Sequence, residues 1–322
     1  MRATPPPPSP RYWPHVGYYG LVAKWRGLRR EHLRKSVVVS GSPRSGTTWV
    51  GNIVTEMTGW PSMEEQTGTT RNPGLRELHG WGGRPYRNPD SPDPALAADL
   101  EQVLTGRYLS PGLIFTNRHN TLGLWAQRPL ASKVIDMNLI MPWVATNLPW
   151  LRVVQLIRNP LTVVASRLVV TTAVWSSATS LGSVYADFMA VEPSYAGPLE
   201  FETPAETQTA AWAIEHAWLR DNMDRLGGLH WLRYEDLRDD PHRTIPDLAR
   251  FVGVEGIEVD QLRSFKRVSR STTKAPVGSA TPASPTSSSP QGITDDVLER
   301  MHGILEHYGY PFYDRETLLA DR

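Results

Sequence analysis

The stretch VVVSGSPRSGTTW, residues 37–49, decides the fold. Its three consecutive valines predict a buried strand, and the residues after the turn predict a helix over 47–58. Gly41 and Gly46 have the spacing of the two glycines of a Walker A phosphate-binding loop. Walker A continues with a lysine that reaches the terminal phosphates of ATP, and this chain has Thr47 at that position. The stretch therefore predicts an anion-binding loop that lacks the ATP-specific lysine.

The chemistry of this loop favours a short anionic group. A glycine-rich turn before a helix presents backbone N–H groups and the positive end of the helix dipole to an anion. Thr47 and Thr48 add hydroxyl donors, and Arg44 is the cation within the loop. A guanidinium binds forked anionic oxygens and stays charged. We expect a diphosphate-like ligand rather than a triphosphate with magnesium; a plain strand–turn–helix is the alternative.

Strands and helices alternate along the rest of the chain. Such alternation predicts an α/β protein whose parallel sheet is covered by helices on both faces, with ligands at the carboxyl ends of the strands. The expected strands are residues 36–39, 131–135, 151–157 and 229–233, and the expected helices are 47–58, one starting near 160, 207–226 and 242–252.

Composition narrows the possible functions. The chain has 322 residues, 40% hydrophobic residues, a net charge of +1 and no cysteine, which excludes disulfides and thiolate metal sites. The charge gives no sign of nucleic-acid binding. The most apolar long run, residues 151–170, is interrupted by three arginines, so we expect no membrane span. The N-terminal sequence lacks the apolar core of a signal peptide, and we expect a cytoplasmic location.

The chain is expected to form one main domain. Residues 1–35, with the polyproline run 5–8, are expected to be a partly disordered arm, and residues 36–322 the domain. A Gly/Pro-rich stretch over 71–94 predicts a long loop. The Ser/Thr/Pro-rich residues 275–292 predict a lid or a crossing loop.

The loop GSPRSGTTW resembles the 5′-phosphosulfate loop of the sulfotransferases that use 3′-phosphoadenosine-5′-phosphosulfate (PAPS). The resemblance implies a P-loop-type three-layer α/β fold and transfer of a sulfonate group without a metal. It implies that Arg44 contacts the bridging and sulfonate oxygens and that Trp49 stacks on adenine. The remaining loop contacts implied by the family come from Ser45, Gly46, Thr47 and Thr48.

The segment LRVVQLIRNPLTVVASRL, residues 151–168, resembles the part of the same family that binds the 3′-phosphate. Arg158 ends a predicted strand, Asn159 can cap the next helix and Pro160 suits its first position. An arginine fork and a hydroxyl together suit a compact dianion. The resemblance assigns this contact to Arg158 and Ser166; an arginine in a surface ion pair is the alternative for Arg158.

Two further segments carry cofactor contacts in the family. WLRYEDL resembles its Tyr-Glu-Asp-Leu segment, which implies that Tyr234 lies beside the adenine. Phe265 stands where a second adenine-stacking ring is found, although a core position on a helix suits it equally. Arg270, in a basic cluster of residues 266–274, stands where the family makes its last contacts to the 3′-phosphate; a solvated loop is the alternative.

The catalytic residues depart from the family's cytosolic members. Lys133 stands where those members have a lysine that stabilises developing charge, but Ile135 replaces the histidine that is their general base. Carbohydrate and bacterial members often use a glutamate just after the first helix, which implies Glu65 or Glu64 as the base, with two solvated surface glutamates as the alternative. Asp136 and His119 are the next candidates.

The expected protein is a PAPS-dependent sulfotransferase with no metal site. It would transfer sulfonate to a hydroxyl or amine of a small-molecule, sugar or lipid acceptor and release adenosine 3′,5′-bisphosphate. The alternatives are a P-loop kinase, which would need a lysine at Thr47 and a magnesium carboxylate, and a non-catalytic nucleotide-binding or scaffold protein. The sequence does not identify the acceptor or the oligomeric state.

Overall fold

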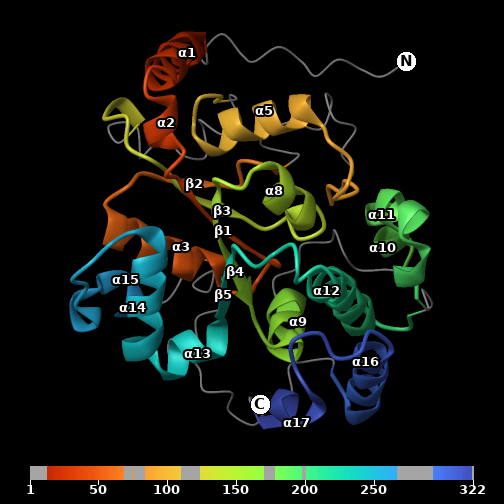
Figure 1. Cartoon of the computed structure of the whole chain (residues 1–322). Helices are drawn as coiled ribbons and strands as arrows, with labels where there is room; N and C mark the ends of the chain where they lie inside the picture. The colour runs from red at the N-terminus through yellow and green to blue at the C-terminus, as the bar shows by residue number, and fades with distance from the viewer. Residues whose placement is uncertain are drawn as a thin grey trace.

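A five-stranded parallel sheet forms the centre of the molecule (Figure 1). The computed structural model describes residues 13–68, 75, 84–109, 124–169, 178–197, 201–266 and 293–320. The strands are β1 (Val37–Gly41), β2 (Ser62–Glu64), β3 (Ala131–Val134), β4 (Arg152–Ile157) and β5 (His230–Arg233). They lie in the order β2-β3-β1-β4-β5, and each neighbouring pair is parallel. The predicted α/β fold with a central parallel sheet is confirmed.

Helices cover both faces of this sheet. The helices are α1 (Trp13–Gly27), α2 (Arg30–Leu33), α3 (Thr47–Thr58), α5 (Pro94–Leu104), α8 (Met141–Asn147), α9 (Pro160–Val169), α10 (Ala178–Val184), α11 (Ala186–Val191), α12 (Pro204–Asp221), α13 (Tyr234–Asp239), α14 (Pro241–Val252), α15 (Arg263–Lys266), α16 (Asp295–His307) and α17 (Arg315–Ala320). Single 3₁₀ turns lie at Pro193–Tyr195 and Val259–Gln261.

The valines of β1 show why the sheet needs two covering layers. Val37 and Val39 pack in a cluster with residues of α3 and α14, whereas Val38 packs in another with residues of α5 and α8. Side chains alternate between the faces of a strand, so an all-apolar strand must be buried on both sides. All three valines are fully buried. Helix α12 packs against α9 and α16, in a third cluster that includes Ile157 of β4.

Most predicted elements have the expected limits, and the differences have local causes. The helix predicted over 47–58 is α3, as expected. The helix predicted over 207–226 is α12, which begins at Pro204 and ends at Asp221. It begins earlier than predicted because the Thr203 hydroxyl caps it by accepting from the N–H of Glu206, and the Glu206 carboxylate accepts from the N–H of Glu202. The edge strand β2 was not predicted, because its three residues are too few to form a pattern.

Residues 13–33, expected to belong to a partly disordered arm, instead form helices α1 and α2. Arg26 in α1 is fully buried. Its guanidinium donates hydrogen bonds to the backbone carbonyls of Thr105, Leu124 and Arg128. Burial lowers the pKa of Arg26 to about 10. A buried cation surrounded by carbonyls fixes α1 to the rest of the domain.

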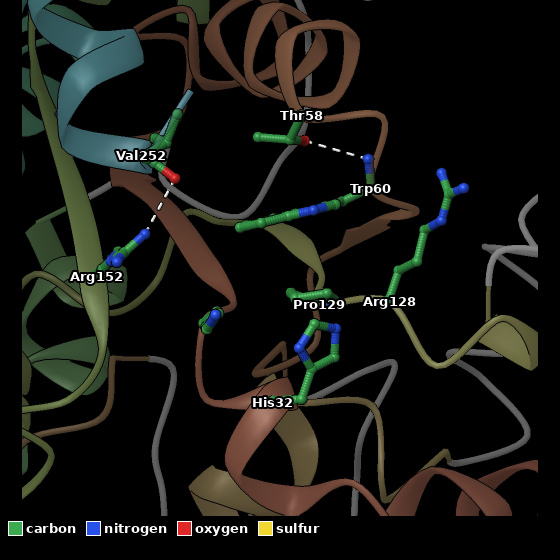
Figure 2. A pocket seen from close by; sticks show the side chains of 9 residues that line it. His32, Thr58, Trp60, Arg128, Pro129, Arg152 and Val252 are labelled. Carbon is green, nitrogen blue, oxygen red and sulfur yellow. Dashed lines mark hydrogen bonds between the residues drawn. The ribbon is translucent and has the colours of Figure 1, made fainter. Parts of the chain in front are cut away.

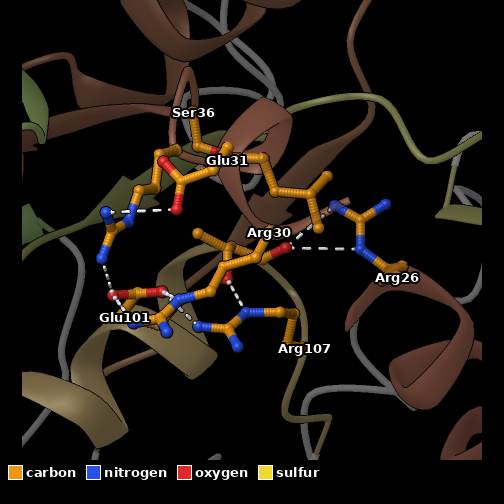
Figure 3. Close-up of polar contacts among 9 residues, drawn as sticks. Arg26, Arg30, Glu31, Ser36, Glu101 and Arg107 are labelled. Carbon is orange, nitrogen blue, oxygen red and sulfur yellow. Dashed lines mark hydrogen bonds and ion pairs between the residues drawn. The ribbon is translucent and has the colours of Figure 1, made fainter. Parts of the chain in front are cut away.

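A cluster of arginines fixes α2 to α5 (Figure 3). Arg30 and Arg107 each approach the Glu101 carboxylate to 2.5 Å, and Arg34 approaches it to 2.8 Å. Burial by itself would raise the pKa of Glu101, but hydrogen bonds from Arg30 and Arg34 and the charge of Arg107 outweigh it and lower the pKa to about 2. The sequence gives no sign of the contacts of Arg30 and Arg34 with Glu101, because they join residues 71 and 67 positions apart.

None of the described helices combines the length and the hydropathy that a membrane span requires. The loop predicted over 275–292 lies outside the described residues.

Candidate functional site

The loop between β1 and α3 has a left-handed backbone at two positions. Arg44 has φ 72° and Gly46 has φ 98°. A Cβ atom on Gly46 would lie 2.7 Å from the Tyr234 ring, so this position needs glycine both for its φ and for space. Alternating right- and left-handed residues turn successive N–H groups toward one point, which is the geometry of an anion-binding nest.

The N-terminus of α3 is available to a ligand. Its N-cap, Gly46, provides no side-chain hydrogen bond to the first turn. The Ser45 hydroxyl is buried and has no hydrogen-bond partner among the described residues, and Thr47 is buried beside it. Buried polar groups are normally paired, so an unpaired hydroxyl at an open helix N-terminus indicates a missing acceptor. These features fit a bound anionic group such as a 5′-phosphosulfate.

Arg44, Ser166 and Arg158 meet at the loop. The Nε of Arg44 donates to the Ser166 hydroxyl at 3.0 Å, and Nη1 of Arg158 donates to the Arg44 carbonyl at 3.1 Å. Neither arginine forms an ion pair with a carboxylate of the described residues. Burial, and then the charge of Arg158, lower the pKa of Arg44. Two neighbouring guanidinium groups without a counter-ion create a strong attraction for an anion.

Three aromatic rings lie beside these arginines. Trp49 stacks on Phe265 with ring centroids 5.6 Å apart and contacts Tyr234 at 5.3 Å. The guanidinium of Arg158 lies over the Tyr234 ring, 4.1 Å from its centroid. The sequence-predicted aromatic residues are therefore one cluster, next to the predicted 3′-phosphate residues. A planar base can bind to such a cluster by stacking.

Lys133 and the two candidate glutamates lie together at the ends of β2 and β3. Nζ of Lys133 lies 2.6 Å from Oε1 of Glu65, 3.7 Å from Oε2 of Glu64 and 3.5 Å from the Thr48 hydroxyl. The Glu65 side chain is 10% exposed and that of Glu64 is 42% exposed. Glu65 has φ 56°, a strained backbone of the kind found at functional sites. Of the two, Glu65 is the buried carboxylate, and it is held against Lys133.

The buried carboxylate of Glu215 holds the loop between β1 and α3 in position through a hydrogen bond from Ser42. Glu215 of α12 accepts hydrogen bonds from the Ser42 hydroxyl at 3.0 Å, from Asn138 at 2.7 Å and from the Tyr185 hydroxyl at 2.7 Å. It also pairs with Nε of Arg84 at 2.8 Å. Burial by itself would raise the pKa of Glu215, but the nearby arginines and the Tyr185 hydroxyl outweigh it and hold the pKa low.

Arg167 of α9 completes this support. It donates to the Ser42 hydroxyl at 2.8 Å and to the Pro43 carbonyl at 3.1 Å. Burial is the main cause that lowers its pKa to about 10. The Ser42 hydroxyl therefore accepts from Arg167 and donates to Glu215. These contacts hold the first half of the loop in place, which is the role of a positioning group rather than of a group that touches the ligand.

The sequence did not predict that Glu215 and Arg167 hold the loop in position. The one usable signal was Glu215 itself, a carboxylate within the run 210–219, which is apolar apart from Glu215 and His216. His216 stacks on Trp212 with a centroid distance of 3.9 Å, and its Nδ1 donates to the Trp212 carbonyl at 2.7 Å. Burial is the main cause that lowers its pKa to about 4.

Other candidate residues are placed differently. Asp136 is buried and accepts from the Thr67 hydroxyl at 2.6 Å, and burial raises its pKa despite opposition from that hydrogen bond and from Arg84. Arg270 and His119 lie outside the described residues. Over the described ranges no group of three or more His, Asp or Glu side chains has the arrangement of a metal site.

Comparisons with known proteins agree with the sequence resemblance. A family model described as the sulfotransferase domain matches residues 34–280. A sulfotransferase domain from the curacin biosynthetic pathway is 17% identical to this chain. The match covers 70% of this chain and 75% of that domain, with a TM-score of 0.38. The mouse sulfotransferase SULT7A1, solved with PAP, is 12% identical, with coverages of 89% and 88% and a TM-score of 0.41. The sulfotransferase STF1 of Mycobacterium tuberculosis H37Rv is 13% identical, with coverages of 90% and 81% and a TM-score of 0.41. Curated proteins give no match.

Proposed function

Since the chain belongs to the sulfotransferase domain family, whose model covers residues 34–280, we propose that the sulfonate group it transfers comes from PAPS. After transfer, the remainder of PAPS would be released as adenosine 3′,5′-bisphosphate. The acceptor would be a hydroxyl or an amine of a small-molecule, carbohydrate or lipid substrate.

The observation that carries this proposal is the set of cations around the loop. Thr47 stands where ATP-binding loops have lysine, while Arg44 and Arg158 lie together with no counter-ion in the described part of the chain. A 5′-phosphosulfate would fit the open N-terminus of α3, with Ser45, Thr47 and Thr48 as hydroxyl donors. The 3′-phosphate would fit Arg158 and Ser166, and adenine would fit the rings of Trp49, Tyr234 and Phe265.

In this proposal PAPS supplies the sulfonate group, whose sulfur bonds to the acceptor oxygen as its bond to the bridging oxygen breaks. Arg44 and Lys133 would neutralise the negative charge that grows on the bridging and sulfonate oxygens. Glu65 would accept the proton that the acceptor hydroxyl loses. Arg167 and Glu215 would keep the loop in position through Ser42.

The Lys133–Glu65 ion pair suggests how the base becomes active. A carboxylate that is paired with an ammonium group at 2.6 Å is a weaker base than an unpaired one. Lys133 also lies 3.5 Å from the Thr48 hydroxyl, at the first turn of α3. An anion bound at that turn would attract the ammonium group and weaken its hold on Glu65. Donor binding would therefore prepare the base for proton transfer.

Binding and transfer assays test this function. Adenosine 3′,5′-bisphosphate should bind more tightly than ATP with magnesium, and labelled sulfonate should pass from PAPS to a member of an acceptor library. Tighter binding of ATP with transfer of its terminal phosphate would identify a kinase instead. Tight binding of PAPS with no transfer to any acceptor would identify a non-catalytic nucleotide-binding protein.

Replacement of Arg158 should weaken the binding of ligands that carry a 3′-phosphate. We expect Arg158→Ala to cost about 1.5–3 kcal/mol of binding free energy for adenosine 3′,5′-bisphosphate, the range for hydrogen bonds to charged groups. Adenosine 5′-phosphosulfate, which lacks that phosphate, should lose much less. Isothermal titration calorimetry with both ligands measures the difference. Equal losses would show that Arg158 acts through its hydrogen bond to the Arg44 carbonyl, as a support of the loop.

Turnover should not need a divalent metal. The loop lacks the Walker lysine, and Arg44 and Lys133 supply positive charge where magnesium acts in ATP-binding enzymes. The rate should be unchanged in EDTA. A rate that EDTA abolishes and magnesium restores would contradict this account of the loop.

A further inference from the structure

A second pocket lies at the opposite end of the sheet from the phosphate loop (Figure 2). Its volume is about 620 Å³. Lys35 and Pro129 in its wall come just before β1 and β3, and Arg152 is the first residue of β4. The pocket is therefore built on the amino ends of the strands, whereas the candidate active site is built on their carboxyl ends. Its size is in the range of small-molecule sites.

The charged side chains of this pocket are all basic. They are those of His32, Lys35, Arg128 and Arg152, and no Asp or Glu is among the described residues that line it. Arg128 and Arg152 each donate one hydrogen bond from Nη1, at 3.0 Å, to the carbonyl of Gly59 and of Val252 respectively. These bonds fix the two guanidinium groups and leave their other N–H groups for a ligand.

No carboxylate among the described residues forms an ion pair with any of these four basic side chains. The pKa of His32 is lowered, first by burial and then by the charge of Lys35, followed by Arg29 and Arg26. The basic side chains without a carboxylate partner among the described residues give this pocket a positive field.

Trp60 provides an apolar surface inside this basic ring. Figure 2 shows its indole across the middle of the pocket, with Thr58 on one side and Pro129 on the other. The indole is partly buried against the core cluster beneath α3 and α14, and in the described part of the chain no second ring or guanidinium stacks on it. A partly buried indole that lines a pocket among cations suits a planar ring that carries a negative charge.

We infer that this pocket is a second binding site, for an aromatic anion: a planar ring with a phosphate, sulfate, sulfonate or carboxylate group. The ring would stack on Trp60. The anionic group would accept from Lys35 and from the guanidinium of Arg152 or Arg128.

The site is separate from the one proposed for PAPS. Helix α3 begins in the phosphate loop and ends at Thr58 in this pocket, and its twelve residues span about 18 Å. The inference uses no residue of the proposed donor site, so it holds or fails independently of the proposed function.

The test uses naphthalene-2-sulfonate as the probe and isothermal titration calorimetry on the full chain. We expect the wild type to bind it, Lys35→Glu to weaken binding about tenfold or more, and Trp60→Ala to weaken it about two- to tenfold. The neutral analogue naphthalene-2-sulfonamide should bind at least tenfold more weakly than the sulfonate. Parallel titrations with 2-naphthoate and 2-naphthyl phosphate rank the anionic groups.

Controls separate this pocket from the phosphate loop. The variant Arg158→Ala should leave probe binding unchanged. Lys35 and His32 are exposed, so Lys35→Glu and His32→Gln keep the test valid even if Trp60→Ala unfolds the protein. No binding to the wild type, equal binding to Lys35→Glu, or loss of binding in Arg158→Ala would each overturn the inference.

Discussion

Glu65→Gln should lower turnover at least about a hundredfold and leave donor binding nearly unchanged. A hydroxyl acceptor is a poor nucleophile at neutral pH until a base removes its proton, and a positioned base contributes about 10²–10⁴-fold. Ile135 occupies the position of the family's usual histidine base, and Glu65 is the buried carboxylate that lies against Lys133 at 2.6 Å. Glutamine keeps the shape and a hydrogen-bond acceptor but cannot take a proton. Single-turnover rates and the dissociation constant of PAPS give the two quantities.

The neighbouring residue provides a matched control. Glu64→Gln makes the same chemical change one position away, on a side chain that is 42% exposed and 3.7 Å from Lys133. It should change turnover only a few-fold. A large loss in Glu64→Gln with a normal rate in Glu65→Gln would exchange the roles of the two residues. Normal rates in both variants would move the base to another group, with Asp136 and His119 the next to replace.

Local sequence patterns predicted the parts of the fold that depend on local causes. The triple valine of β1 and the spacing of Gly41 and Gly46 predicted a strand, a turn and a helix; the helix limits match the structure, and the strand runs two residues further, to Gly41. The order of the strands places the phosphate loop, Lys133 and Arg158 at one edge of the sheet, as expected for the carboxyl ends of parallel strands. The family resemblance predicted the residues around this edge, and the structure brings Arg44, Arg158 and Ser166 into contact.

Contacts between distant segments could not be predicted in the same way. Glu215 and Ser42 are 173 residues apart, and nothing near either residue in the sequence indicates the other. Helices α1 and α2 follow a polyproline run that suggested an arm, and they are held by contacts of Arg26 and Glu101 to residues 79 and 67 positions away. Buried polar contacts of this kind depend on the tertiary structure, so a single sequence carries little signal for them.

Removal of the Glu215 carboxylate should destabilise the domain by about 3–5 kcal/mol, the cost of leaving a buried ion pair without one partner. Glu215→Gln keeps the volume, but Arg84 loses its counter-ion at 2.8 Å and Arg167 loses a nearby negative charge. The Ser42 hydroxyl also loses a charged acceptor. Urea denaturation gives the free energy of unfolding. At temperatures where the variant remains folded, the loss of loop support should raise the dissociation constant of PAPS, because Ser42 and Pro43 are no longer held in one position.

The pH dependence distinguishes this charge effect from a packing defect. The pKa of Glu215 in the folded protein lies below its unfolded value of about 4.3, so its stabilisation is complete above that pH and is lost as the pH falls through the folded pKa. The difference in stability between the wild type and Glu215→Gln should therefore be constant near neutral pH and shrink in acid. Asp136, whose pKa is raised, titrates in both proteins and largely cancels in the difference. Glu299→Gln is the control, since Glu299 and Arg315 are 68% and 55% exposed and an exposed pair contributes about 0–1 kcal/mol. A Glu215→Gln protein as stable as this control, or a difference that does not change with pH, would show that the buried arginines do not depend on this carboxylate.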